Sequence, residues 1–138
     1  MEKMRSLIQA FPAQLKHAWG IAQSSPIDFN GWTPANALIL GMGGSGISGA
    51  IASKMLSDTS PVPIIANNDY TVPAWTGNAT LVVACSYSGN TEETLAALDA
   101  AVKAGARVVA ITSGGKLGVL CDAHGWPSIR IPGGEPPR

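Results

Sequence analysis

A chain of 138 residues is large enough to bury roughly two thirds of its unfolded surface in one core, so a single main fold is expected. Nine basic residues balance nine acidic ones, and this neutral total argues against a nucleic acid or an acidic membrane surface as a partner. Charged residues make up only 13% of the chain, against about a quarter in typical soluble domains. We therefore expect part of the surface to be covered by a second subunit or a further domain.

The cysteines and the first residues indicate a reducing, cytoplasmic setting. The chain begins MEKMRSLIQAF, without the long apolar run and cleavage site of a secretory signal, and no stretch approaches the roughly 20 apolar residues of a membrane span. Cys85 and Cys121 are far apart and lie in apolar surroundings, which predicts two buried thiols. His17 and His124 have no further ligand at metal-binding spacing, so no metal site is expected.

An amphipathic helical segment is predicted at the N-terminus. Apolar residues recur there at steps of three and four, at Leu7, Ile8, Phe11, Leu15, Ala18 and Trp19. Pro12 either begins a new helix or kinks this one, because proline lacks the amide hydrogen that a helix interior uses. We interpret residues 1–35 as a helical cap on the main domain, which takes residues 36–138.

Short apolar runs then alternate with helical patterns. The runs that predict strands lie at 37–40, 62–66, 81–85, 108–112 and 128–131, and the helical patterns at 47–56, 95–102 and 117–123. Because right-handed crossovers place helices on both faces of a parallel sheet, we expect an α/β fold: a doubly wound, flavodoxin-like αβα sandwich with about five parallel strands. Residues 67–78 form a long connection without a helical pattern, of the kind that is usually functional or covered by a partner.

The first candidate binding loop is the run GMGGSG, which follows the first strand and opens a helix. Gly43 and Gly44 would let the backbone approach an anion, Ser45 adds a hydroxyl, and the first amide groups of the helix point toward such a ligand. The run also matches the dinucleotide fingerprint G-x-G-x-x-G, with Asp69 where a ribose-binding acid could be sought. This loop alone leaves a phosphate and a dinucleotide both open.

The second candidate loop, SYSGNT, follows the third strand and opens the next helix. Ser86, Ser88 and Thr91 present three hydroxyls around one point, which suits the three terminal oxygens of a phosphate monoester better than a bridging pyrophosphate. The alternative is an over-supplied helix cap, with Asn90 capping and Glu93 closing a capping box. We expect phosphate binding, because a cap needs a single hydroxyl.

Two charged groups near these loops are expected to be structural. Glu92 and Glu93 invite an acid–base role, but carboxylates are favoured in a first helical turn by the dipole, and one aimed at a phosphate would repel it. Lys116, after a pair of glycines, is expected to begin a solvated helix.

Four motifs in order, GMGGSG, SYSGNTEET, ITSGGKL and IPGGEPPR, resemble those of the sugar isomerase (SIS) family. More narrowly, the chain from the region of Leu38 onward resembles the N-terminal SIS domain of the bifunctional phosphoglucose/phosphomannose isomerases. The resemblance implies that Gly44 and Ser45 lie against the sugar and that Arg138 lies beside the reacting carbons. It also implies that the phosphate is held by Ser86, Ser88 and Thr91.

The resemblance implies an activity as well. Glucose 6-phosphate or mannose 6-phosphate would be interconverted with fructose 6-phosphate by ring opening and proton transfer between C1 and C2 through a cis-enediol, with no metal or organic cofactor. In the family, a Glu base assisted by a His and a Lys comes from a second SIS domain or a partner subunit, and none of these is located in this chain. The partner that we expect is a second copy, in a homodimer formed through SIS domains. Because no base is located here, we expect the 138 residues to hold the phosphosugar without turning it over.

Two other functions remain open. A regulatory module that senses phosphosugars would have the same two loops and no catalytic partner. A nicotinamide-binding domain would use the first loop alone.

Overall fold

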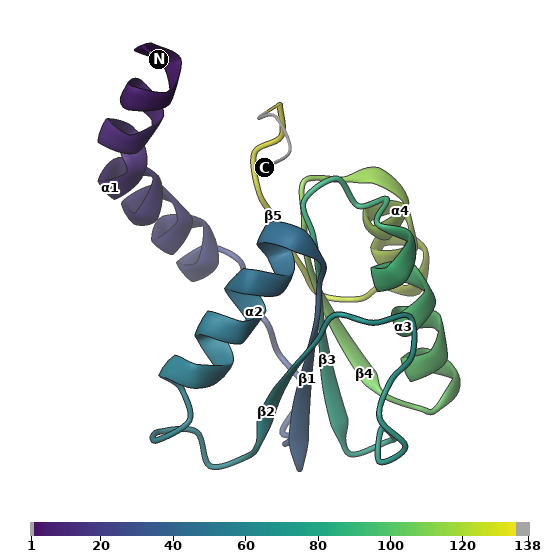
Figure 1. Ribbon diagram of the computed structural model, residues 1–138. Coiled ribbons are helices and arrows are strands. Elements are labelled where there is room, and N and C mark those ends of the chain that lie inside the picture. The colour runs from purple at the N-terminus through teal and green to yellow at the C-terminus, as the bar shows by residue number, and fades with distance from the viewer. Residues whose placement is uncertain (1, 135–138) are drawn as a thin grey trace.

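The computed structural model describes residues 2–134, which form a five-stranded sheet and four helices (Figure 1). The helices are α1 (Glu2–Gln23), α2 (Gly43–Met55), α3 (Glu92–Lys103) and α4 (Gly115–His124). The strands are β1 (Asn36–Leu40), β2 (Ile64–Asn67), β3 (Thr80–Ser86), β4 (Arg107–Thr112) and β5 (Ser128–Arg130). They lie in the order β2-β1-β3-β4-β5, and every neighbouring pair is parallel. The predicted α/β class with five parallel strands is confirmed.

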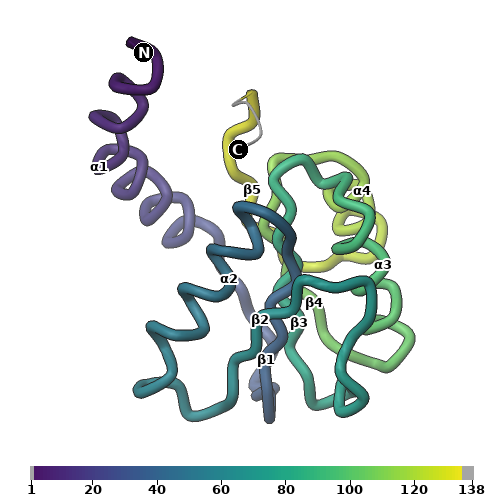
Figure 2. The backbone as a smooth tube through the Cα atoms, viewed as in Figure 1, coloured from purple at the N-terminus to yellow at the C-terminus, as the bar shows by residue number. Residues whose placement is uncertain are grey.

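Helices cover both faces of this sheet. The inaccessible core joins β1, β3 and β4 to α3 and α4, and its largest members are Leu38, Leu40, Val82, Leu98 and Leu117. On the other face α2 crosses β1 so closely that a Cβ at Gly49 would lie 2.9 Å from Cγ2 of Ile39. Figure 2 shows α2 on one side of the strands and α3 and α4 on the other. The predicted doubly wound sandwich is therefore present.

The strand order reverses between β1 and β3. From β1 the chain passes through α2 to β2 at one edge, crosses back to β3, and then continues through α3, β4 and α4 to β5 at the other edge. Open α/β sheets bind ligands at such a switch point, outside the carboxyl ends of the strands. Both candidate loops lie there, because GMGGSG follows β1 and SYSGNT begins at the end of β3.

All three helices after β1 begin earlier than the apolar pattern predicted. Their first turns contain glycine, serine or glutamate, which add nothing to an apolar stripe, so the periodicity becomes visible only in the second turn. The consequence is functional. Each helix delivers its N-terminal amide groups directly to the carboxyl edge of the sheet, the upper edge in Figure 1.

The N-terminal helix extends away from the sheet, and none of its residues is buried (Figure 1). It runs without a break through Pro12, which therefore does not begin a new helix, since a proline removes one hydrogen bond and the flanking turns keep theirs. The segment after α1 is tied to β4: the Arg107 guanidinium lies 4.5 Å from the Trp32 ring centroid. The division into a cap of residues 1–35 and a domain of residues 36–138 stays a prediction. Within residues 2–134, none of the helices has the length and apolar character needed to cross a bilayer.

Candidate phosphate-binding site

Two glycines that tolerate no side chain make the turn from β1 into α2. A Cβ at Gly41 would lie 2.9 Å from the carbonyl carbon of Ser45, and one at Gly46 would lie 2.8 Å from the Gly41 oxygen. The Gly46 amide donates to the Met42 carbonyl at 3.1 Å. Strand and helix are therefore joined by backbone in direct contact, which fixes where α2 begins.

The other two glycines of this loop face open space. A Cβ at Gly43 or Gly44 would have no heavy atom within 4 Å. Gly43 has φ +54°, a conformation that favours glycine, but Gly44 has no such requirement. Neither packing nor backbone geometry explains why position 44 is a glycine. A ligand that approaches the backbone would account for it.

The start of α2 also leaves donors free. Its N-cap residue, Met42, makes no side-chain capping bond, so the first amide groups of the helix have no intrahelical acceptor. Ser45, in the first turn, is partly exposed, and its hydroxyl makes no hydrogen bond within residues 2–134. Asn68, the residue directly after β2, lies beside this loop, with its Cβ 3.8 Å from where a Cβ on Gly46 would lie. Sequence reasoning missed Asn68, because nothing in its pattern marks it.

The three hydroxyls of the second loop have different surroundings. Ser86 is buried, and its Oγ lies 2.8 Å from Oγ1 of Thr91 and accepts the Gly89 amide at 3.1 Å. Ser88 is exposed, and its Oγ accepts the Asn90 amide at 3.1 Å. Ser86 and Thr91 thus close the loop from inside, whereas Ser88 lies on its outer side.

The capping alternative for this loop is wrong. The N-cap of α3 is Thr91, whose side chain makes no capping bond. Asn90 caps nothing in α3, because its Oδ1 accepts the Lys116 amide at 3.0 Å. The first amide groups of α3 are therefore left without a side-chain acceptor, at the positive end of the helix dipole.

The carboxylates at the start of α3 lie near the connection between β2 and β3. Partial burial and the charges of Glu92 and Glu93 together raise the pKa of the Tyr70 hydroxyl in that connection above its ordinary value. Asp69 beside it is exposed and accepts the Tyr70 amide at 2.6 Å, which is a local turn contact. Arg138, expected beside the reacting carbons, lies outside the described residues.

A separate hollow of about 400 Å³ lies between α2 and β2, at the far end of the strands from both loops. Ser53, which lines it, donates to the Ile64 carbonyl at 2.6 Å. It contains none of the predicted binding residues.

Several curated proteins are similar to this chain in sequence. No protein-family model matches the chain. The chain is 40% identical over 127 residues to a bifunctional phosphoglucose/phosphomannose isomerase of Caldicellulosiruptor bescii, a match that covers 92% of this chain and 38% of that protein. It is 41% identical over 99 residues to a D-glucosamine-6-phosphate 4-epimerase of Sulfolobus acidocaldarius, covering 71% of this chain and 31% of that one. The chain thus spans about a third of the length of these relatives.

The fold has been seen in solved structures. The structure of tagatose-6-phosphate ketose/aldose isomerase from Escherichia coli matches with a TM-score of 0.60 and 18% identity, over 93% of this chain and 36% of that one. At that identity the likeness concerns the fold alone. Together these findings show that the chain has the SIS fold of the phosphosugar isomerases and is homologous, over about a third of their length, to the bifunctional phosphoglucose/phosphomannose isomerases.

Proposed function

We propose that this chain is the phosphosugar-binding part of an isomerase that interconverts glucose 6-phosphate or mannose 6-phosphate with fructose 6-phosphate. The observation that carries the proposal is the meeting of two donor-rich loops at the switch point between β1 and β3. Each loop opens a helix whose first amides lack a side-chain cap, and such amides attract anions. The names of the relatives supply the substrate class.

Each loop has a distinct role in the proposal. The phosphate is held by Ser88, Thr91 and the free amides of α3, with Ser86 fixing the loop from within. The sugar lies against Gly43, Gly44 and Ser45, where no side chain crowds the backbone. Fixed dipoles of this kind cost no reorganisation when the charged ligand arrives.

The chemistry needs more than these loops. Transfer of a proton between C1 and C2 requires a positioned base, and the enediolate charge requires a fixed cation. We assign the cation to Arg138 and no base to this chain, since Glu92 and Glu93 lie near the Tyr70 connection. The proposal needs no metal or organic cofactor, and we place the protein in the cytoplasm.

Calorimetric titration tests the proposal. The chain should bind glucose 6-phosphate and fructose 6-phosphate, bind glucose much more weakly, and show no heat with NAD. Preference for NAD would overturn the proposal and would indicate that GMGGSG binds a dinucleotide.

A coupled assay of fructose 6-phosphate conversion tests the turnover. It should detect none by the 138 residues, and should detect turnover by a version extended to the length of the relatives. Phosphosugar binding without turnover in the extended version would favour a regulatory module instead. Turnover of D-glucosamine 6-phosphate in place of glucose 6-phosphate would favour the epimerase activity named for the second relative.

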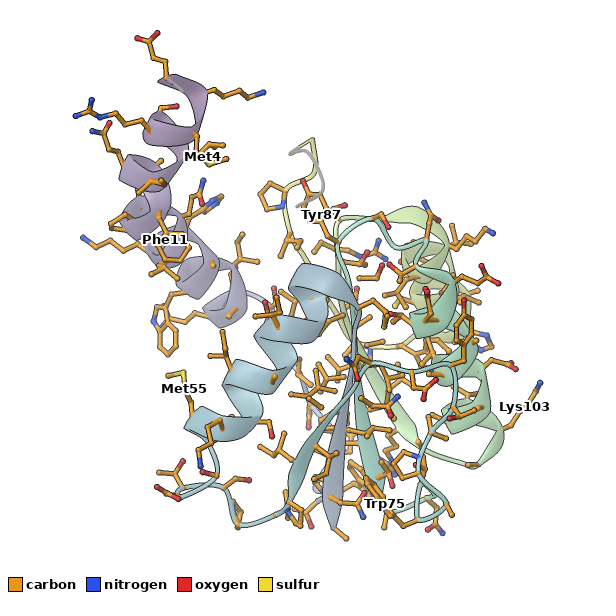
Figure 3. The ribbon with its side chains drawn as sticks, in the orientation of Figure 1. Met4, Phe11, Met55, Trp75, Tyr87 and Lys103 are labelled. Atoms are coloured by element: carbon orange, nitrogen blue, oxygen red, sulfur yellow. The ribbon has the colours of Figure 1, made fainter. Side chains whose placement is uncertain are left out.

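We further infer that the chain forms a homodimer. Large apolar side chains are exposed at helical spacing on two helices: Met4, Ile8, Phe11, Leu15 and Trp19 on α1, and Ile47, Ile51 and Met55 on α2. Figure 3 shows Met4 and Phe11 on α1 and Met55 on the outer side of α2. We call these eight side chains the apolar surface. A second copy would cover it with the same apolar residues in a two-fold interface, as the low charge content of the chain suggests.

A further inference from the structure

The turn between β4 and α4 lies directly against the SYSGNT loop, residues 86–91, which we call the phosphate loop. We call residues 113–117 the support turn. Four hydrogen bonds run from it to residues 87–90: Ser113 N and Oγ donate to the Tyr87 carbonyl at 3.1 and 2.5 Å, Lys116 N to Asn90 Oδ1 at 3.0 Å, and Leu117 N to the Gly89 carbonyl at 2.9 Å. Every one of these donors belongs to the support turn, and the phosphate loop supplies all of the accepting oxygens.

Glycines allow the two backbones to touch. Gly115 has φ +63°, and a Cβ there would overlap the Ser88 carbonyl oxygen and lie 2.9 Å from Asn90 Oδ1. Gly89 has φ +72°, and a Cβ there would overlap the Gly114 carbonyl oxygen. A side chain at either position would push the loop that carries Ser88 away from its place.

The support turn is itself fixed to the sheet. Thr112, the last residue of β4, is inaccessible to solvent. Its Oγ1 donates to the Gly114 carbonyl at 3.0 Å and accepts the Gly114 amide at 3.1 Å. Since β4 is an interior strand between β3 and β5, the turn has a rigid base.

The contacts also decide which helix ends remain available to a ligand. The Lys116 and Leu117 amides at the start of α4 donate to oxygens of the phosphate loop. These two amides are therefore not available to a ligand. Because Asn90 Oδ1 is engaged by Lys116, it is kept from capping α3, whose own amides stay free.

We propose that the support turn positions the phosphate loop for its ligand, with Gly115, Asn90 and Ser113 as positioning residues that do not touch the phosphate themselves. This inference rests on the proposed function. It gives the ITSGGKL motif a role in holding the phosphate loop in place, without contact to the phosphate. The turn holds Ser88 and the α3 amides at the spacing that a phosphate requires before the phosphate arrives.

A pair of glycine variants tests this. Gly115→Ala adds a methyl at positive φ against the phosphate loop, while Gly125→Ala adds one at φ +67° at the other end of α4, with no atom within 4 Å. Both should lower the melting temperature through backbone strain. Only Gly115→Ala should weaken glucose 6-phosphate and inorganic phosphate binding, by about tenfold or more, because displaced donors no longer match the ligand.

Two further measurements keep the test decisive. If Gly115→Ala does not fold, Asn90→Ala, which adds no atoms, should weaken binding several-fold. Ser113→Thr should bind better than Ser113→Val, since both add a similar branch and only the threonine keeps the hydroxyl that bonds the Tyr87 carbonyl. A support turn with a merely structural role would change melting temperatures and leave these affinities equal, and that result would overturn the proposal.

A ligand-free measurement separates this inference from the proposed function. In native-state hydrogen exchange, Gly115→Ala should speed exchange at the amides of Gly89 and Asn90, which donate to Ser86 and to Ser88 Oγ, whereas Gly125→Ala should not. If the unmodified chain binds no phosphosugar, the proposed function fails while the exchange comparison still decides whether the support turn orders the loop. Equal exchange in the two variants would overturn that ordering.

Discussion

Oγ of Ser86 lies 2.8 Å from Oγ1 of Thr91, so the hydroxyls at the two ends of the phosphate loop are joined to each other. Ser86 also accepts the Gly89 amide and is 1% exposed, which makes it part of the loop's own framework. Within residues 2–134, the Ser88 hydroxyl has the Asn90 amide as its only partner, and Ser88 is exposed. The three hydroxyls that look equivalent in SYSGNT therefore have separable contributions to stability and to binding.

Replacing Ser88 by Ala should weaken glucose 6-phosphate binding by about 1.5–3 kcal/mol, the usual scale of a hydrogen bond to a charged group. Its melting temperature should change little, because the side chain is exposed. Ser86→Ala should instead lower the free energy of unfolding by about 1–3 kcal/mol, since it leaves buried groups without their partner. Calorimetric titration and thermal melts of both variants check this. An unchanged dissociation constant for Ser88→Ala would contradict the role given to Ser88.

Gly44→Ala should keep or raise stability while it weakens binding. Gly44 has no positive φ and no neighbour within 4 Å of an added Cβ, so alanine can gain up to about 1 kcal/mol of helix propensity there. The added methyl would occupy the space in which we place the sugar. Gly20→Ala, at an equally open position in α1, is the control and should raise stability without affecting affinity. If the two variants bind glucose 6-phosphate equally well, the space beside Gly44 is not part of the site.

Short continuous apolar runs predicted the sheet, because strands buried on both faces consist almost entirely of apolar residues. The run of residues 37–40 is too short for a helix and is followed by glycines, and Leu38 and Leu40 are fully buried in β1. Helix starts were harder, because glycine-rich first turns carry no apolar stripe. Pro12 does not begin a new helix as the sequence suggested, since one lost hydrogen bond does not end a long helix.

The two loops were predictable for a similar reason, but their connections to the rest of the chain were not. Hydroxyl and glycine density is visible along the chain, whereas the bond from Lys116 to Asn90 joins residues 26 positions apart. A glycine required by a neighbouring loop, such as Gly115, looks like any flexible glycine until that neighbour is placed. Contacts between loops depend on the strand order, which local patterns do not specify.

If the chain is a homodimer, placing a charged residue in the apolar surface should lower its molecular mass in solution. Ile51 is 54% exposed in the middle of its α2 stripe, so Ile51→Glu should convert a dimer into a monomer, because a carboxylate would have to be buried without a partner. Val119→Glu, at a residue 68% exposed on α4, is the matched control and should leave the mass unchanged. Light scattering coupled to gel filtration measures both. A monomeric unmodified chain would contradict the homodimer.

Cys85 predicts a loss of stability in alkaline solution. Burial raises the pKa of its thiol to about 11, from 9.0 for the exposed group, so between these values the folded chain holds a proton that the unfolded chain has lost. Stability from this thiol is therefore complete below pH 9 and falls as the pH rises through 11, by on the order of 3 kcal/mol at most. Lysines and tyrosines titrate in the same range, so the informative quantity is the difference in stability loss between variants.

The decrease in the free energy of unfolding between pH 8 and pH 10.5, measured by urea denaturation, should be smaller in Cys85→Ala than in the unmodified chain. Cys121→Ala controls for the loss of a second thiol whose pKa burial also raises. Parallel curves for the unmodified chain and Cys85→Ala would show that the Cys85 thiol titrates alike in the folded and unfolded states, and that solvent reaches this face of the sheet.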